Sequence, residues 1–180
     1  PSTSSAASDV YKRQANAFLT TNTAAAMAAL TWLVISGLHT GKMSAVGAAT
    51  GAVAGLVAIT PACGWVDVGG ALMIGLSASV VCYLCAIGME KSGVDDALVV
   101  FGVHGIGGAW GALMTGVFAS EAIGGVKGLL EGNGVIVLEQ LVGIVATFLY
   151  SGIATFIILK VLDVIPVSYT HLTLPTRLMV

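Results

Sequence analysis

The chain has 180 residues, of which 57% are hydrophobic and 9% are charged, and its formal net charge is -2 at pH 7. Soluble domains carry roughly 25% charged residues, so this composition excludes an ordinary soluble globule, and the negative charge argues against nucleic acid as a partner. The mean hydropathy of +0.98 and the abundance of glycine and alanine are typical of packed membrane helices. The sequence therefore predicts a polytopic membrane protein.

The two ends of the chain differ from the rest in composition. Residues 4–14 can be back-translated into a DNA string that resembles a widely used transposase sequencing adapter, and one frame of its reverse complement encodes residues 167–176. Chance does not readily produce two unrelated peptides from one string and its complement. We therefore predict that residues 1–14 and 167–180 are adapter-derived, non-native tails, and we leave both out of the fold argument.

Five apolar windows reach or approach the roughly 20 residues that a helix needs to cross a bilayer. In chain order they are residues 17–38, 44–60, 69–89, 97–118 and 135–162. The second window is at the lower limit of length, and the last is long enough to tilt or to extend beyond the bilayer. The sequence therefore predicts an all-α, polytopic bundle of about five transmembrane helices.

The connections between the windows carry turn and capping signals. The run Gly-Lys-Met at 41–43 predicts a tight turn, and Thr-Pro-Ala-Cys-Gly at 60–64 breaks the chain before the third helix. The carboxylate of Asp95 or Asp96 can cap the N-terminus of the fourth helix. The longest connection is residues 119–134.

The lysines predict the orientation of the bundle. Lys42, Lys91 and Lys160 fall on one side, whereas Lys127 falls on the other. Because positive residues favour the cytoplasmic side, we expect a multi-pass protein of the cell membrane whose first helix begins outside and whose last helix ends inside.

Small residues indicate where helices approach one another. Gly47, Gly51 and Gly55 recur at four-residue spacing in the second window, a pattern that lets helix backbones come close. Cys82 and Cys85 have the C-x-x-C spacing of zinc and redox sites, but they lie in an apolar helix without a nearby His or Asp. We interpret them as packing residues and predict no metal or cofactor; a redox role would require both thiols to be reachable by labelling.

His104 is the most informative residue, because it places an ionisable ring inside an apolar window. Ionisable groups at membrane depth are candidates for function. Gly107, Gly108 and Gly111 follow it and leave room for a neighbouring helix or a narrow lumen, so we expect the ring to face protein and not lipid. From the position of His104 in the apolar window alone, a functional role and a structural hydrogen bond between helices are equally favoured.

Several runs of the chain resemble ammonium transporters of the Amt/Mep type. Residues 95–108 (Asp-Asp-Ala-Leu-Val-Val-Phe-Gly-Val-His-Gly-Ile-Gly-Gly) resemble the helix that carries their second pore histidine. Residues 51–66 resemble their eighth helix and its outer loop, and residues 41–44 the turn before it, while residues 17–26 look like their seventh helix. The resemblance covers essentially all of residues 15–166.

The resemblance implies a function and an assembly. It implies an eleven-helix, inverted-repeat protomer in a homotrimer, of which residues 15–166 are the C-terminal half with helices 7–11. It implies transport of ammonium or ammonia, and no enzymatic activity, through an apolar pore with a histidine pair to which this chain contributes His104. Val100 and Thr60 would line that pore. Membrane lipid and a PII-type regulator are further implied partners.

Two departures and two rival functions accompany this interpretation. Val99 stands where the family usually has Asp, which affects the helix start, and Met43 stands where it has Pro. One rival is an ammonium sensor module coupled to a signalling domain. The other is an intramembrane enzyme that uses His104 with Asp95 or Asp96, although those carboxylates lie about 12 Å or more from the ring along a helix, at 1.5 Å per residue.

Overall fold

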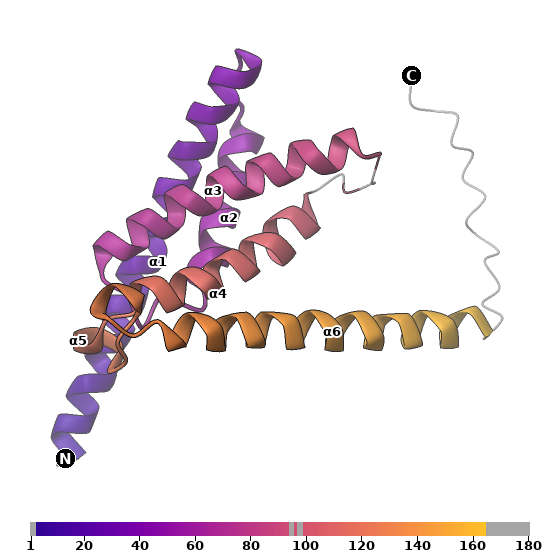
Figure 1. Ribbon diagram of the computed structural model, residues 1–180. Helices are drawn as coiled ribbons and strands as arrows, with labels where there is room; N and C mark the ends of the chain where they lie inside the picture. Colours follow the sequence, from indigo (N-terminus) through magenta and orange to yellow (C-terminus); the bar gives the residue numbers. More distant parts are fainter. Residues whose placement is uncertain (1–2, 94–95, 97–98, 165–180) are drawn as a thin grey trace. The chain divides into compact units, whose positions relative to one another are not determined.

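The computed structural model describes residues 3–93, 96 and 99–164, and within these ranges every regular element is helical (Figure 1). The long elements are α1 (Thr3–Thr40), α2 (Ala45–Ile59), α3 (Val68–Lys91), α4 (Gly107–Phe118) and α6 (Val135–Val164). Three short elements are η1 (Phe101–Ile106), α5 (Glu121–Gly124) and η2 (Leu129–Glu131). The predicted all-α fold is confirmed.

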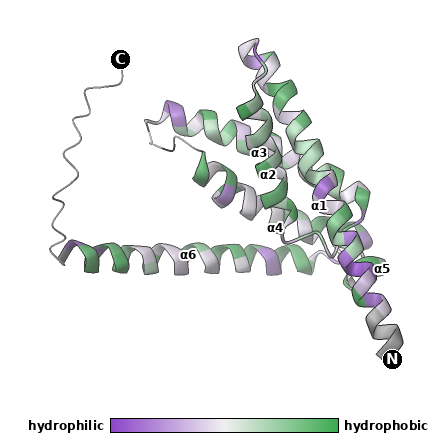
Figure 2. Ribbon diagram, turned by 180° about the vertical axis from the view of Figure 1, so that it is seen from behind, coloured by the Kyte–Doolittle hydropathy of each residue, from purple (hydrophilic) through white to green (hydrophobic). Residues whose placement is uncertain are grey.

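Each predicted window contains a helix, with two differences. Helix α1 begins at Thr3, inside the segment that we predict to be a non-native tail. The fourth window divides into the π-helix η1 and the α-helix α4. In the described part of the chain, segments of α1 (Ser8–Thr40), α3 and α6 (Val135–Asp163) are long and apolar enough to cross a membrane, whereas α2 is a shorter apolar helix. Figure 2 shows hydrophobic residues along these helices.

The chain forms two units, Pro1–Ile144 and Val145–Val180. In the first unit, α1 packs against both α2 and α3, and the segment η1–α4 packs against the same two helices. The described part of the second unit is residues 145–164, the C-terminal part of α6.

The core of the first unit is made largely of small side chains. One buried cluster combines alanines of α1, α2 and α3 with a few larger residues, and it contains Ala24, Ala58, Ile59, Ala62, Val66, Ala71, Ile74 and Ala78. A second cluster contains Trp32, Ala54, Cys82, Tyr83 and Val103. Alanine-rich cores bring helix axes close together, as in membrane bundles generally.

Glycines make the closest helix contacts. A Cβ atom added at Gly55 of α2 would lie 2.5 Å from the Ala24 carbonyl oxygen on α1, and one added at Gly75 of α3 would overlap the same oxygen. On α2, a Cβ atom at Gly51 would lie 2.8 Å from the Ala28 carbonyl oxygen. The predicted packing role of the α2 glycines is therefore confirmed, and the helix that packs against them is α1.

The ends of α2 and α3 are set by local capping. The Ser44 hydroxyl accepts a hydrogen bond from the Gly47 N–H at 2.9 Å, and the Asp67 carboxylate accepts one from the Gly70 N–H at 2.7 Å. Such N-caps satisfy N–H groups that have no partner within the helix. Before α2, Gly41 adopts a positive φ of 73°, which confirms the predicted tight turn.

The turn at 60–64 is held by polar side chains of α1. The Asn16 amide donates to the carbonyl oxygens of Cys63 and Val66, each at 2.9 Å, and the Thr20 hydroxyl donates to Cys63 O at 2.9 Å. These bonds satisfy backbone carbonyls that the α2–α3 break leaves without a helical partner. The break predicted from the Thr-Pro-Ala-Cys-Gly run is thus confirmed and is fixed by α1.

The connection 119–134 is organised by Glu131. Its carboxylate accepts hydrogen bonds from the Ser120 hydroxyl at 2.7 Å and from the Glu121 N–H at 2.8 Å. The bond from the Glu121 N–H is the main reason that the pKa of Glu131 is lowered, with smaller contributions from Ser120 and the nearby Lys127. Because ionised Glu131 forms these bonds best, their stabilising effect is complete above the ordinary glutamate pKa and is lost as the pH falls through the lowered value.

A Glu131→Gln variant is expected to loosen this connection at neutral pH, because the amide offers one acceptor oxygen in place of two. The protection factor of the Glu121 N–H against hydrogen–deuterium exchange should fall, and the wild-type protein should approach the same protection factor when the carboxylate is protonated. Lys127→Ala is the control, since the exposed Lys127–Glu121 ion pair contributes little. Equal exchange in wild type and Glu131→Gln would contradict the assigned role of the carboxylate.

Candidate functional site

His104 lies in η1, a π-helical turn at the start of the fourth predicted span. The N–H of Gly107 donates to the carbonyl oxygen of Gly102, five residues back, which is the hydrogen bond that defines π geometry. Single π turns within helices are frequent at functional sites. The sequence pattern did not reveal this turn, because apolar periodicity cannot distinguish it from an ordinary α-helix.

Asp96 caps this turn. Its carboxylate accepts hydrogen bonds from the N–H groups of Val100 at 2.7 Å, Phe101 at 3.0 Å and Gly102 at 3.4 Å. The predicted capping of the fourth span is therefore confirmed for Asp96, whereas Asp95 lies outside the described residues. All three of these hydrogen bonds go to backbone N–H groups, and none of them involves the His104 ring.

Val99 adopts a backbone conformation that is unusual for its type. Its φ is +54°, and it is the one non-glycine residue with positive φ in the described part of the chain. A β-branched side chain is strongly disfavoured there, at a cost on the order of 1–3 kcal/mol, whereas Asp and Asn are tolerated. The departure noted at this position thus places strain directly before the turn that carries His104.

The face of η1 that carries His104 is uncovered in this chain. The His104 side chain is exposed, and Val100 and Phe101 are 52% and 48% exposed. No described residue makes a hydrogen bond with the His104 ring, so the expected protein neighbour of the ring does not come from within the described parts of the chain. The structure does place Val100 and His104 on one accessible stretch at the start of the span.

The glycines after His104 pack against α2 and α3. A Cβ atom added at Gly107 would lie 2.9 Å from the Cys82 sulfur, and one at Gly111 would overlap the backbone of Ala58. The predicted room for a neighbouring helix is confirmed at these two positions. Cys82 is fully buried and Cys85 half-buried, which agrees with their interpretation as packing residues.

Thr60 lies apart from Val100 and His104. It is an exposed residue at the C-terminal end of α2, and its hydroxyl donates to Leu56 O at 2.7 Å. Ala58, two residues earlier, meets the fourth span at Gly111, about 10 Å beyond His104 at 1.5 Å per residue. The three predicted pore residues therefore fall at two levels along the bundle and do not form one compact cluster.

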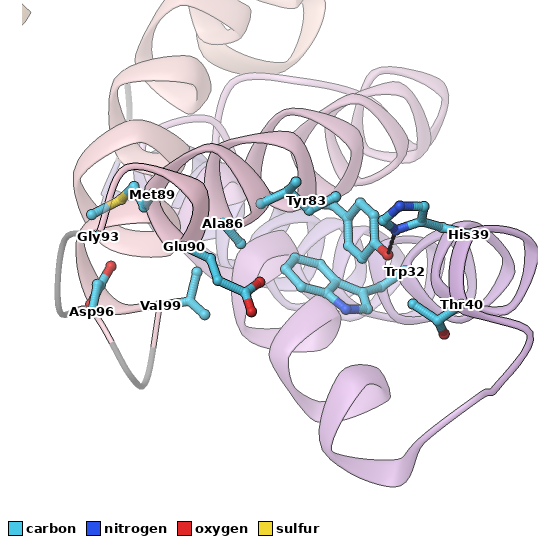
Figure 3. A pocket seen from close by; sticks show the side chains of 11 residues that line it. Trp32, His39, Thr40, Tyr83, Ala86, Met89, Glu90, Gly93, Asp96 and Val99 are labelled. Atoms are coloured by element: carbon cyan, nitrogen blue, oxygen red, sulfur yellow. Dashed lines mark hydrogen bonds between the residues drawn. The ribbon is translucent and has the colours of Figure 1, made fainter.

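A pocket of about 640 Å³ opens between the C-terminal parts of α1 and α3 and the residues Asp96 and Val99, which precede η1 (Figure 3). Its lining includes Trp32, His39, Tyr83, Glu90, Asp96 and Val99. His39 lies near the C-terminal end of α1. Its ring is exposed, but Nδ1 of His39 shares a 3.0 Å hydrogen bond with the Tyr83 hydroxyl.

A sequence signal for this pocket existed and was missed. Trp32 and His39 are two helical turns apart on α1, and Tyr83 and Glu90 have the same spacing on α3. Residues seven apart lie on one face of a helix. Two such polar–aromatic faces in neighbouring helices indicate a shared site only if the helices are known to pack side by side, and that information comes from the fold.

Comparison with known proteins identifies the chain. The profile of the Ammonium Transporter Family matches residues 2–170. An ammonium transporter of Aquifex aeolicus is 50% identical over 83% of this chain and 36% of its own length. The crystal structure of Saccharomyces cerevisiae Mep2 superimposes with a TM-score of 0.81 at 34% identity, covering 86% of this chain and 36% of Mep2. A solved structure described as a sensor Amt protein gives a TM-score of 0.72 at 30% identity, over 84% of this chain and 38% of its own.

The chain thus spans a little over a third of the length of the relatives it matches. These relatives are named as transporters and not as enzymes, and the match includes the span that carries His104. On these grounds, the chain belongs to the ammonium transporter family.

Proposed function

We propose that this chain forms part of an ammonium transporter and supplies one wall of its pore, with Val100, His104 and Thr60 facing the lumen. The observation that carries the proposal is the exposed His104 on a capped π-helical turn, in a chain of a transporter family. The His104 ring has no hydrogen-bond partner in the described part of the chain. This is expected for one member of a histidine pair whose other member lies in another part of the full-length protein.

Physical chemistry explains why such a pore would use imidazoles. Moving an unpaired ammonium ion into an apolar lumen is very costly, whereas neutral ammonia requires far less desolvation. A pair of imidazoles can accept a hydrogen bond from the substrate and hold or relay its proton. The apolar Val100 beside His104 would keep water out of that section of the lumen.

Further parts of the proposal concern the whole protein. We infer a homotrimer in the cell membrane, with the N-terminal end of α1 outside and the C-terminal end of α6 inside, and a PII-type regulator as a partner. We also infer that residues 1–14 and 167–180 are non-native; the Aquifex match covers 150 residues, close to the length of 15–166. Finding the codons of both tails in the genomic locus would disprove this last point.

Uptake of labelled methylammonium into proteoliposomes tests the transport proposal. The full-length protein is expected to take up the label faster than protein-free liposomes, and excess sodium or potassium should not compete. The similarity to the sensor Amt protein favours an ammonium sensor as the second candidate. Folded, full-length protein that binds ammonium without any uptake would contradict transport and support the sensor.

A further inference from the structure

We propose that the pocket between α1, α3 and the residues Asp96 and Val99 before η1 binds an ammonium-type cation, either ammonium itself or a primary alkylammonium. The pocket is separate from the proposed pore wall, since Val100, His104 and Thr60 do not line it. The proposal rests on the proposed function only for the identity of the cation; the pocket chemistry stands by itself.

Aromatic rings form one side of the pocket. Trp32 and Tyr83 are only 6% and 8% exposed, and their rings meet edge to face with centroids 5.2 Å apart. The hydrogen bond between His39 and the Tyr83 hydroxyl fixes the outer edge of this group. Indole and phenol rings attract cations through their negative faces, and the attraction is larger where water is partly excluded.

A carboxylate without a partner completes the site. Glu90 has no side-chain hydrogen bond or ion pair with any residue in the described part of the chain, and Figure 3 shows its side chain extending toward the Trp32 indole. The other acid of the pocket, Asp96, is occupied by the N–H groups of η1. Among the described lining residues, Glu90 is therefore the carboxylate that is available to a ligand.

The charge of the lining selects for cations. None of the described lining residues is lysine or arginine, whereas two are acidic. Lys42 and Lys91 lie near the same helix ends but outside the lining. An anion would meet the carboxylates without a compensating positive group, whereas the exposed Glu90 carboxylate remains free to pair with a cation that enters the pocket. A compact cation with N–H donors satisfies both the carboxylate and the rings.

The pocket also adjoins the support of His104. Asp96 and Val99 belong both to its lining and to the segment that begins η1. On the orientation inferred above, the pocket opens on the cytoplasmic side, below the turn that carries His104. It therefore provides a place where a cation can be held at the inner end of the proposed pathway.

Saturation-transfer NMR with methylammonium chloride tests the pocket in this chain, reconstituted in lipid nanodiscs. Irradiation of the protein's aromatic protons should reduce the methylammonium methyl signal in a saturable manner. Glu90→Gln is expected to raise the apparent dissociation constant about tenfold, which corresponds to about 1.4 kcal/mol. Glu139→Gln removes the same charge from an exposed position on α6 outside the lining, and should leave binding unchanged.

His104→Ala separates this proposal from the proposed function. Binding in the nanodisc assay should be unchanged by this substitution, because His104 does not line the pocket. Equal dissociation constants for Glu90→Gln and Glu139→Gln, with helical circular dichroism retained in both, would overturn the cation site and leave the pore proposal intact. Loss of binding in His104→Ala would place the observed site at the pore and overturn the pocket assignment.

Discussion

A His104→Ala variant of the full-length protein is expected to lose methylammonium uptake down to the level of protein-free liposomes. The alanine removes the one side chain among the exposed residues Val100, Phe101 and His104 that can accept a hydrogen bond from the substrate and hold its proton. Loss of a positioned proton-transfer group commonly costs about 100-fold to 10,000-fold in rate, which brings uptake below detection. Proteoliposome uptake at equal protein content is the measurement.

Leu84→Ala serves as the matched control for this substitution. Leu84 is 62% exposed on α3 and lies outside both the proposed pore wall and the pocket, so its truncation should leave uptake near the wild-type rate. Within this chain His104 is exposed and makes no hydrogen bond with a described residue, so its replacement should leave the packing of α1, α2 and α3 intact. Uptake and cation selectivity that survive in His104→Ala would refute its pore role.

A Gly75→Ala variant is expected to destabilise the packing of α1 and α3 by about 3 kcal/mol, the upper end for overpacking. The added methyl group would overlap the carbonyl oxygen of Ala24, and backbone atoms within a helix cannot move aside as a flexible side chain can. Gly55 of α2 meets the same oxygen, so a shift of α1 would disturb two helix contacts at once. The free energy of unfolding in lipid nanodiscs is the quantity to measure.

Gly88→Ala tests whether this effect comes from packing or merely from replacing a glycine. Gly88 lies on the same helix, and an added Cβ atom would meet nothing within 4 Å. Its replacement should be neutral or should stabilise the helix by up to about 1 kcal/mol, since alanine has the higher helix propensity. If both variants unfold at the same free energy, the close contact at Ala24 is not a determinant of the fold.

Local signals in the sequence were sufficient to predict the helices and their breaks. Apolar windows long enough to span a bilayer, the glycine turn at Gly41 and the Thr-Pro-Ala-Cys-Gly break act over a few residues, so no tertiary information is needed to read them. The same holds for the Asp96 cap, since the carboxylate binds N–H groups within six residues of itself. His104 also stood out for a local reason, as an ionisable ring in an apolar run.

The π-helical turn and the strain at Val99 could not be predicted in this way. Both depend on how the start of the fourth span fits between α2 and α3, where Val103 is buried and Gly107 contacts the Cys82 sulfur. Helix period alone assigned residues 97–118 to one continuous helix. Packing against α2 and α3 decides whether this helical turn widens into a π turn. The apolar pattern of one segment contains no information about that packing.

By itself, the sequence determined that this protein is an all-helical membrane bundle, where the chain turns before α2 and before α3, and that His104 is the principal candidate for function. Only the tertiary structure decided that the α2 and α3 glycines meet at Ala24, that the His104 face is uncovered, and that Trp32, Tyr83 and Glu90 share a pocket. The physical reason is the range of the interactions. Capping, turn formation and bilayer insertion depend on neighbouring residues, whereas a pocket or a close helix contact requires side chains from helices far apart in the chain.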